Sequence, residues 1–213
     1  MSKPFSEACE RNKEPIAEHL IRLFAACRQI LEIGSGTGQH AAYFALKLPH
    51  VTWQPSDLPL HHAGIEAWIK GSKQSNILPP LHLDVSRMPW PELKADGIFT
   101  ANTLHIMPWE SVQDLFKGAA ALLPAKGLLV AYGPFNENGE YTAPSNKSFD
   151  EFIRHRDPRS GLRDRLALNV LAESHGLKPL ERHELPANNQ LLVWQKQAPG
   201  LLQRLRNTLG RQA

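Results

Sequence analysis

Three glycines within five residues form the first group in this chain that could do chemistry. The apolar run at residues 30–33 predicts a buried strand, and Gly34, Gly36 and Gly38 end it sharply. A strand that turns on glycines into a helix offers backbone N–H groups to a ligand at the positive end of the helix dipole. A Cβ there would hold the ligand away from the backbone. The pattern predicts a loop that binds a small anionic or nucleoside ligand.

The spacing of the glycines distinguishes between kinds of nucleotide site. A dinucleotide fingerprint needs glycine three residues after Gly36, where this chain has Gln39. A Walker phosphate loop is disfavoured because no Gly-Lys-Ser/Thr follows. A nucleophile elbow around Ser35 fails because Ile33 and Thr37 stand where glycines are required. The remaining form, Glu-x-Gly-x-Gly-x-Gly, fits S-adenosylmethionine.

Two carboxylates follow predicted strands downstream of this loop. Asp57 lies about one βαβ step further on, where a carboxylate accepts from both ribose hydroxyls. Asp84 ends the third predicted strand, where it can accept from an adenine amino group while Val85 covers the base. Each could instead be a turn or N-cap residue. Together with the glycine loop they favour an S-adenosylmethionine site.

A candidate reaction centre follows the fourth predicted strand. Asn102 and His105 are expected at the carboxyl edge of the sheet, near the crevice where the strand order reverses. Methyl transfer is an in-line displacement, so the protein chiefly aligns donor and acceptor, and a neutral amine or hydroxyl acceptor must also lose its proton. His105 is the candidate base. The alternative is a hydrogen bond from His105 to the neighbouring loop or to the cofactor.

The elements that must position these residues alternate between strand and helix. Five strands are predicted first, at residues 30–33, 51–53, 81–83, 97–100 and 127–132. Because helices or crossover-length segments separate them, their pairing should be parallel with right-handed connections. Two later strand-like runs flank a short loop at residues 186–189, which predicts an antiparallel edge. The residues therefore predict a doubly wound, mostly parallel α/β sheet with one antiparallel edge.

The chain is expected to form one domain over residues 1–198. The long polar stretch at 133–163 contains several prolines and glycines and predicts a lid or an inserted binding loop. Residues 199–213 contain leucines at helical spacing together with arginines and no acid, which predicts a basic amphipathic helix or tail. Such a helix would pack on its own domain or on a second subunit, so a homodimer is one assembly to expect.

The composition is typical of a globular cytoplasmic protein. The chain has 213 residues, of which 42% are hydrophobic and 21% charged, with a net charge of +3. This balance does not call for a nucleic-acid partner. The two cysteines, Cys9 and Cys27, exclude a disulfide scaffold and a four-cysteine zinc site. A charged N-terminal segment and the lack of a long apolar stretch predict no export signal and no membrane span.

Metal chemistry finds little support among the ten histidines. His61 and His62 are adjacent rather than one helical turn apart, and Ala187 stands where a zincin-type motif starting at His183 would need histidine. We predict no metal site.

Eight segments resemble one group of enzymes. They are Cys9-Glu-Arg-Asn-Lys-Glu-Pro-Ile16, Leu31–His40, Trp53-Gln-Pro-Ser-Asp57, Ala101-Asn-Thr-Leu-His-Ile-Met-Pro-Trp109, Tyr132-Gly-Pro-Phe-Asn136, Arg156-Asp-Pro158, Gly161-Leu-Arg-Asp164 and Pro186-Ala-Asn-Asn189. On these segments the chain resembles class I S-adenosylmethionine-dependent methyltransferases and, more narrowly, the family that includes methyltransferase-like protein 26, over about residues 5–196. The resemblance implies a doubly wound, seven-stranded, mostly parallel α/β sheet with an antiparallel last strand and a cofactor at the carboxyl ends of the strands, and it leaves the methyl acceptor open.

The site residues expected on these grounds fall into two groups. The cofactor-binding residues are Arg11, Asn12, Lys13, Glu32, Gly34, Ser35, Gly36, Gly38, His40, Asp57, Asp84, Val85, Asn102 and His105. The candidate substrate-binding residues are Tyr132, Phe135, Tyr141, Arg163, Asn188 and Asn189. Residues 10–13 are expected just before the first helix, folded over the cofactor, where Arg11 or Lys13 could pair with its carboxylate. A solvated, charged N-cap region is the alternative.

The sequence therefore predicts a methyltransferase that uses S-adenosylmethionine and acts on a small-molecule acceptor. An NAD(P)-dependent oxidoreductase is an alternative from another reaction class, although Gln39 counts against it. A non-catalytic protein that binds S-adenosylmethionine is the other alternative.

Overall fold

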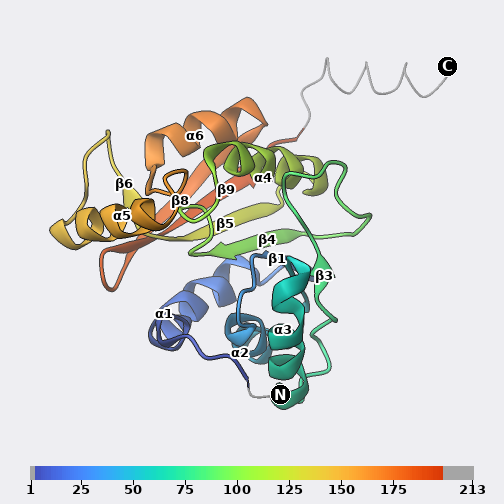
Figure 1. Ribbon diagram of the computed structural model, residues 1–213. Helices are drawn as coiled ribbons and strands as arrows, with labels where there is room; N and C mark the ends of the chain where they lie inside the picture. The colour runs from blue at the N-terminus through green and yellow to red at the C-terminus, as the bar shows by residue number, and fades with distance from the viewer. Residues whose placement is uncertain (1–2, 199–213) are drawn as a thin grey trace.

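A seven-stranded sheet lies at the centre of the computed structural model, which describes residues 3–198 (Figure 1). Its strands are β1 (Gln29–Ile33), β2 (Thr52–Asp57), β3 (Leu81–His82), β4 (Gly97–Ala101), β5 (Leu128–Gly133), β8 (Leu177–Leu185) and β9 (Asn189–Lys196). They lie in the order β3-β2-β1-β4-β5-β9-β8. The pairs from β3 to β5 are parallel, and β9 runs antiparallel to both β5 and β8. The predicted fold class is confirmed, with the antiparallel last strand inside the sheet rather than at its edge.

Helices cover both faces of this sheet. They are α1 (Glu7–Leu23), α2 (Gln39–Lys47), α3 (Pro59–Ser72), α4 (Trp109–Leu122), α5 (Pro144–Arg156) and α6 (Arg165–Ser174). In Figure 1, α1, α2 and α3 lie on one side of the sheet and α4 and α6 on the other. Successive strand residues alternate between the two cores: Ile30 packs with α1 and α2, whereas Leu31 packs with α4. Both faces are buried, which explains the continuous apolar runs in the sequence.

The first helix begins earlier than its apolar pattern indicates. Ser6 caps it by accepting a hydrogen bond from the Cys9 backbone N–H, and Glu7 and Glu10 occupy the first turn, where carboxylates favour the helix dipole. The expectation that residues 10–13 precede the first helix is therefore wrong, because these residues form its first turns.

The polar stretch at 133–163 is more ordered than a loop. It contains α5 and the strand β6 (Phe135–Asn136), which pairs in parallel with β7 (Arg163–Asp164). The buried residues of α5 are Asn146, Asp150 and Ile153, so its inward stripe is mostly polar. An apolar periodicity could not reveal such a helix, because its buried face is satisfied by hydrogen bonds.

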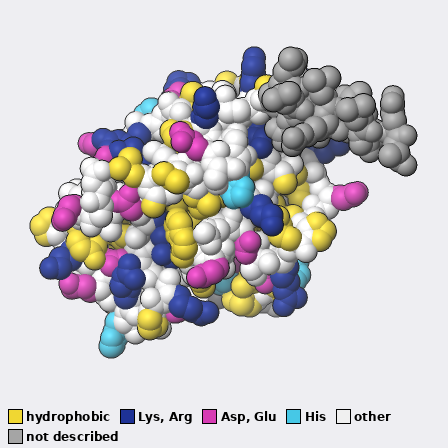
Figure 2. All heavy atoms as spheres, turned by 90° about the horizontal axis from the view of Figure 1, so that it is seen from above, with side chains coloured by type: hydrophobic (Ala, Val, Ile, Leu, Met, Phe, Trp, Pro, Cys, Tyr) yellow, Lys and Arg dark blue, Asp and Glu magenta, His cyan; other side chains and the backbone are white. Residues whose placement is uncertain are grey.

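The surface carries charges of both signs. On the face shown in Figure 2, Lys and Arg side chains are interspersed with Asp and Glu rather than gathered into one patch. In residues 3–198, none of the helices is both long enough and apolar enough to span a bilayer. The predicted C-terminal amphipathic helix, at residues 199–213, lies outside the described residues.

Candidate functional site

The glycine loop connects β1 to α2 and opens onto a cavity. Its glycines all have positive φ, and the Gly34 and Ser35 N–H groups donate to the Ser56 carbonyl at 3.0 and 3.1 Å, which ties the loop to β2. A Cβ on Gly36 would meet no atom within 4 Å, so it would project into open space. A Cβ on Gly38 would stand 2.7 Å from the Ile65 Cα. Gly36 thus leaves space for a ligand, while Gly38 permits close packing against α3.

Glu32 supports this loop from beneath. Its Oε2 accepts hydrogen bonds from Trp53 Nε1 at 3.0 Å and from Ser35 Oγ at 2.9 Å. Burial raises the pKa of Glu32 to about 7, and these two donors oppose the shift. The carboxyl lies under the loop rather than in the cavity wall.

Asp57, at the end of β2, is joined directly to the loop. Its Oδ2 accepts the Gly36 N–H and its Oδ1 accepts the Leu58 N–H, both at 2.7 Å. Both Asp57 and Gly36 line the cavity, so a carboxylate and a glycine backbone face one space. The geometry therefore brings together the two features that the sequence separates by 21 positions.

Asp84 lies further along the same wall, after β3. Its Oδ1 accepts from the Ser86 N–H at 3.1 Å and from Ser86 Oγ at 2.7 Å. The hydrogen bond from the Ser86 hydroxyl is the main cause of the lowered pKa of Asp84, and burial opposes it. Arg87 pairs with the other oxygen at 3.3 Å. Asp84 thus closes a turn and lines the cavity together with Leu83 and Val85.

Helix α1 covers the loop from the other side. The Nε2 of His40 donates to Asn12 Oδ1 at 2.7 Å, because a carboxamide oxygen can only accept. Burial lowers the pKa of His40 to about 4, so the ring is neutral at pH 7. Arg11 lines the cavity, whereas Lys13 pairs with Glu10 and lies over the Tyr43 ring, away from the cavity.

The segment after β4 carries the candidate reaction centre. Asn102 has φ +57°, a left-handed conformation that is uncommon for residues other than glycine. His105 is 4% exposed, packs edge-to-face against Phe149 and lines the cavity. Burial, with a smaller effect of Arg163, lowers the pKa of His105 to about 4. No described residue hydrogen-bonds to its ring, so the neutral imidazole is open to the cavity.

Arg163 fixes the position of this segment without lining the cavity. Its Nε donates to the Leu104 carbonyl at 2.9 Å, and its guanidinium also donates to the carbonyls of Met107 and Arg159. The Gly161 N–H donates to the His105 carbonyl at 2.9 Å. The substrate contact predicted for Arg163 is not seen in this geometry, because its donors are used by backbone carbonyls.

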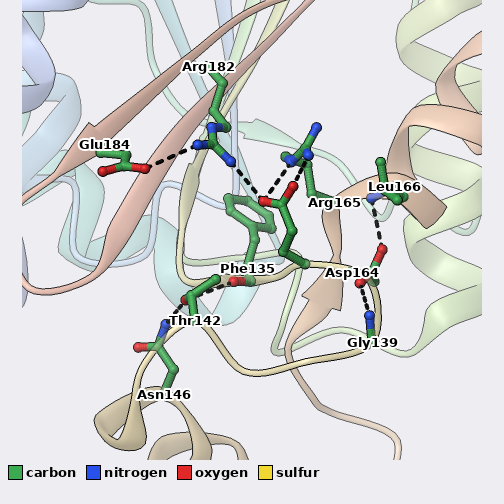
Figure 3. A network of polar contacts seen from close by, with 10 residues as sticks. Phe135, Gly139, Thr142, Asn146, Asp164, Arg165, Leu166, Arg182 and Glu184 are labelled. Atoms are coloured by element: carbon green, nitrogen blue, oxygen red, sulfur yellow. Dashed lines mark hydrogen bonds and ion pairs between the residues drawn. The ribbon is translucent and has the colours of Figure 1, made fainter.

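Phe135 and Tyr141 make contacts within the inserted segment at residues 133–163. Phe135 is buried in the core, and its carbonyl accepts from Thr142 Oγ1 at 3.3 Å (Figure 3). The Tyr141 hydroxyl donates to the buried carboxylate of Asp150 at 2.8 Å. Neither residue lines the cavity, in contrast to its predicted role.

Ion pairs anchor the base of the inserted segment (Figure 3). Glu137 accepts from both Arg165 and Arg182. Asp164 caps α6 through the Leu166 N–H at 2.8 Å and accepts the Gly139 N–H at 2.7 Å. The segment is thereby fixed to α6 and β8.

The cavity has a volume of about 1230 Å³, above the roughly 300–1,000 Å³ of common small-molecule sites. The predicted residues that line it are Arg11, Asn12, Gly34, Ser35, Gly36, His40, Asp57, Asp84, Val85, Asn102, His105, Tyr132, Asn188 and Asn189. Those that do not are Lys13, Glu32, Gly38, Phe135, Tyr141 and Arg163. A space of this size can hold a nucleoside cofactor and a second small molecule.

Sequence reasoning missed part of the wall. The added lining residues with polar or aromatic side chains include Ser6, Cys9, Thr37, Ser111, Ser145, Asn146 and Phe149. The last three of these lie on α5, whose polar stripe gave no apolar signal, and Ser6 could have been found as the cap of α1. Within residues 3–198, no group of three or more His, Cys, Asp or Glu side chains is arranged to hold a metal ion, and the absence of a metal site stays a prediction.

Comparisons with known proteins agree with this architecture. Residues 3–196 match a family model described as "Protein of unknown function (DUF938)". An O-methyltransferase family protein from Burkholderia thailandensis has a TM-score of 0.80 at 17% identity, covering 91% of this chain and 59% of that chain. Human N-acetylserotonin methyltransferase, solved with S-adenosylmethionine, has a TM-score of 0.73 at 14% identity, covering 90% of this chain and 53% of that chain.

A third structure is similar over nearly its whole length. A candidate sarcosine dimethylglycine methyltransferase from Galdieria sulphuraria has a TM-score of 0.72 at 17% identity, covering 90% of this chain and 87% of that chain. The chain spans less than three fifths of the length of the two other structures. At these identities, the likeness establishes the class I methyltransferase fold.

Proposed function

We propose that this chain, which belongs to the DUF938 family of proteins of unknown function, binds S-adenosylmethionine and transfers its methyl group to a small-molecule acceptor. The observation that carries the proposal is the direct hydrogen bond between the Gly36 N–H and the Asp57 carboxylate, both of which line the cavity. The cofactor bound in one structural neighbour supports the same assignment.

The cavity wall fits this cofactor chemically. Open space beside Gly36 leaves the backbone accessible, Asp57 would accept from the ribose, and Asp84 with Val85 would flank the base. Arg11 would pair with the carboxylate of the methionine part. The remaining proposed cofactor contacts are the other lining residues of this wall, Asn12, Gly34, Ser35, His40 and Asn102. Glu32 and Gly38 lie outside the lining and shape the glycine loop, and Lys13 pairs with Glu10 away from the cavity.

The chemistry is a methyl transfer. When bound, the cofactor supplies a sulfonium whose methyl–sulfur bond breaks with its electron pair left on sulfur, while the acceptor oxygen or nitrogen bonds the methyl carbon and releases its proton. The protein's task is to align the two molecules and to exclude water. His105, neutral and open to the cavity, would accept the proton at a ring nitrogen.

The narrower features of the protein belong to the same proposal. The motifs around Asn102 and Asn188 support membership of the family that includes methyltransferase-like protein 26, and this narrower membership is part of the proposal. A single catalytic domain over residues 1–198, a cytoplasmic location and a homodimer complete the hypothesis.

Calorimetric titration tests the cofactor assignment directly. We expect saturable heat with S-adenosylmethionine and with S-adenosylhomocysteine, and none with NADH. Gly36→Ala would place a Cβ in the open space and should weaken that heat, while the φ of +56° costs this variant only about 1 kcal/mol of stability. Binding of NADH alone would favour the oxidoreductase alternative and reject this one.

Label transfer separates an enzyme from a non-catalytic binding protein. With methyl-labelled donor, we expect label to appear in at least one hydroxyl or amine compound of a broad panel. His105→Gln should then lower kcat by about 100-fold, in the range of general-base catalysis, and leave the affinity for S-adenosylhomocysteine within twofold. A loss of affinity with unchanged kcat would instead assign His105 to cofactor contact.

A further inference from the structure

The two ends of the cavity differ in charge. The end beside β1, β2 and β3 contains the carboxyl side chains of Asp57 and Asp84. The opposite end is formed by the end of β5, by α5 and by the turn between β8 and β9. Its lining residues are His105, which packs on Phe149, together with Tyr132, Pro134, Ser145, Asn146, Phe149, Pro186, Ala187, Asn188 and Asn189. None of them is Asp, Glu, Lys or Arg, and burial lowers the pKa of His105 to about 4, so its ring is neutral at pH 7. A charged group buried there would find no counter-ion, which disfavours its binding.

Three asparagines of this end, Asn146, Asn188 and Asn189, form what we call the amide wall. Asn146 Nδ2 donates to Thr142 Oγ1 at 2.9 Å and to the Asn188 carbonyl at 3.2 Å. Asn189 Nδ2 donates to the carbonyls of Pro186 and Ala187 at 3.1 and 3.2 Å. A carbonyl oxygen can only accept, so these contacts fix which end of each amide is nitrogen. The protein therefore holds Nδ2 of Asn146 and of Asn189 and leaves their Oδ1 atoms for another donor.

Asn146 is the member of the amide wall that matters most. The residue is 4% exposed, lines the cavity, and its Oδ1 accepts no hydrogen bond from any described residue. This oxygen is reachable from the cavity, so a ligand that fills the space beside it without bringing a donor would leave it buried and unpaired, which is costly. A bound molecule that brings an O–H or N–H to this oxygen avoids that cost, and a molecule without one does not.

Flat apolar groups lie beside this oxygen. Phe149 follows Asn146 by three positions on α5, so both side chains lie on one face of the helix. Its ring packs edge-to-face on His105 with 5.2 Å between centroids, and Tyr132 and two prolines complete the lining. A planar ring packs well against such surfaces.

We propose that the methyl acceptor is an uncharged aromatic alcohol, bound with its ring beside Phe149 and with one hydroxyl donating to Asn146 Oδ1, while a second hydroxyl receives the methyl group and gives its proton to the His105 ring. The role of this compound as methyl acceptor rests on the proposed methyl transfer. Its preferred binding depends only on the residues at this end of the cavity. Asn146 is thus a specificity-determining residue: it selects compounds with a hydrogen-bond donor, and its uncharged surroundings reject acids and ammonium ions.

Four probes of similar size test this preference by ligand-observed NMR titration of the full chain. p-Cresol is neutral and carries a hydroxyl donor, whereas 4-methylanisole keeps the ring and lacks the donor. 4-Hydroxybenzoate and tyramine keep the hydroxyl and add a negative or a positive charge. We expect p-cresol to bind about tenfold more tightly than each of the others, the size of one well-made hydrogen bond or one avoided charge burial.

Two substitutions at one position assign the preference to the amide wall. Asn146→Leu keeps the volume and removes the acceptor, so p-cresol and 4-methylanisole should bind equally. Asn146→Asp keeps the shape and adds a charge, so tyramine should become the tightest probe. Ser148→Ala is the matched control, because Ser148 lies on α5, is exposed, and donates to the Pro144 carbonyl outside the cavity wall.

Titration of S-adenosylhomocysteine in the same samples separates this inference from the proposed function. If the probe preference holds and S-adenosylhomocysteine does not bind, the cofactor proposal fails and the ligand site stands. If p-cresol shows no binding at millimolar concentration, or if 4-methylanisole, 4-hydroxybenzoate or tyramine binds as tightly, the inference is wrong whatever the cofactor result. Unchanged preferences in both Asn146 variants would also overturn it.

Discussion

The two sides of the cavity are built by different kinds of interaction. On the cofactor side, the Gly36 N–H meets Asp57 across 21 positions of one βαβ unit, and each residue simply follows its own strand. On the acceptor side, Arg163 reaches the Leu104 carbonyl across 59 positions, and Asn188 reaches Ser145 across 43. Contacts within one βαβ unit fix the first side, whereas side-chain hydrogen bonds between segments far apart in the chain fix the second.

This contrast bears on how each side can evolve. The glycine loop needs only a strand, a turn and a helix in sequence, so its form can recur with any surrounding loops. The acceptor side needs Asn146, Arg163 and the β8–β9 turn to meet at once. Acceptor specificity is therefore expected to change more readily than cofactor specificity.

The largest expected effect distinguishes two glycines of one loop. Gly38→Ala should lower the free energy of unfolding by about 4 kcal/mol, because its φ of +87° and the Ile65 Cα at 2.7 Å both oppose a Cβ. Gly36→Ala, with open space around the new Cβ, should cost about 1 kcal/mol. Urea denaturation of both variants measures the difference. Equal costs would contradict the distinct roles of the two glycines.

On the acceptor side, Arg163→Met should lower the free energy of unfolding by about 3 kcal/mol, because three backbone carbonyls lose their donor. The affinity for S-adenosylhomocysteine should change by less than threefold, since Arg163 lies outside the cavity wall. Arg159→Ala is the control, because the exposed Arg159 side chain pairs with Asp157 at the surface. A cofactor affinity that falls as strongly as the stability would mean that the two sides are not independent.

Two buried carboxyl groups, Glu32 on the cofactor side and Asp150 on the acceptor side, should change the free energy of unfolding in opposite directions as pH rises. Burial raises the pKa of Glu32 to about 7, so between pH 4.5 and 7 the folded protein keeps a proton that the unfolded chain loses, and stability falls as pH rises. Burial alone would raise the pKa of Asp150, but hydrogen bonds from Arg154, Leu162 and Tyr141 outweigh it and lower the pKa. Its contribution is therefore present above its unfolded pKa and is lost as pH falls through the folded pKa.

Unfolding free energies of two isosteric variants measure these opposite trends. Relative to Glu32→Gln, the wild type should lose at most about 1.4 kcal/mol for each pH unit from 4.5 to 7. Relative to Asp150→Asn, the wild type should gain stability on going from acid to neutral pH. Parallel pH profiles for both variants would refute the assigned protonation states.

The smallest expected effect concerns the charge of Asp57. Asp57→Asn keeps one acceptor oxygen and removes the charge, so the affinity for S-adenosylhomocysteine should fall about fivefold, or about 1 kcal/mol. Glu173→Gln makes the same chemical change on the exposed surface of α6 and should leave the affinity unchanged. Calorimetry of the two variants gives the comparison, and an unaltered affinity in Asp57→Asn would remove the proposed ribose contact.

The sequence predicted the strand-based half of the molecule well. Residues 30–33, apolar except for Glu32, are buried on both faces, and the glycine loop follows its strand as expected. The alternation of strands and helices predicted the doubly wound core and its antiparallel edge, and the family resemblance implied the seven strands. These features depend on local pattern and on chain connectivity, which a sequence displays directly.

The candidate site was predicted less completely. Three of the predicted residues line the cavity, namely Asp57, Asp84 and His105. Each lies at or shortly after the end of a strand. Tyr141 and Arg163 do not line the cavity, because their polar groups are used by Asp150 and by backbone carbonyls. A polar side chain in a long loop can bind a ligand or its own protein, and spacing alone does not distinguish the two.

The sequence by itself determined the sheet, the glycine turn and the acids at the strand ends, because strand period and turn chemistry are local properties. Only the tertiary structure decided that α5 forms, that its buried stripe is polar, and that Asn146 lies in a wall without charges. Hydrogen bonds between residues far apart in the chain carry that half of the protein. Their partners become known only when the chain is folded.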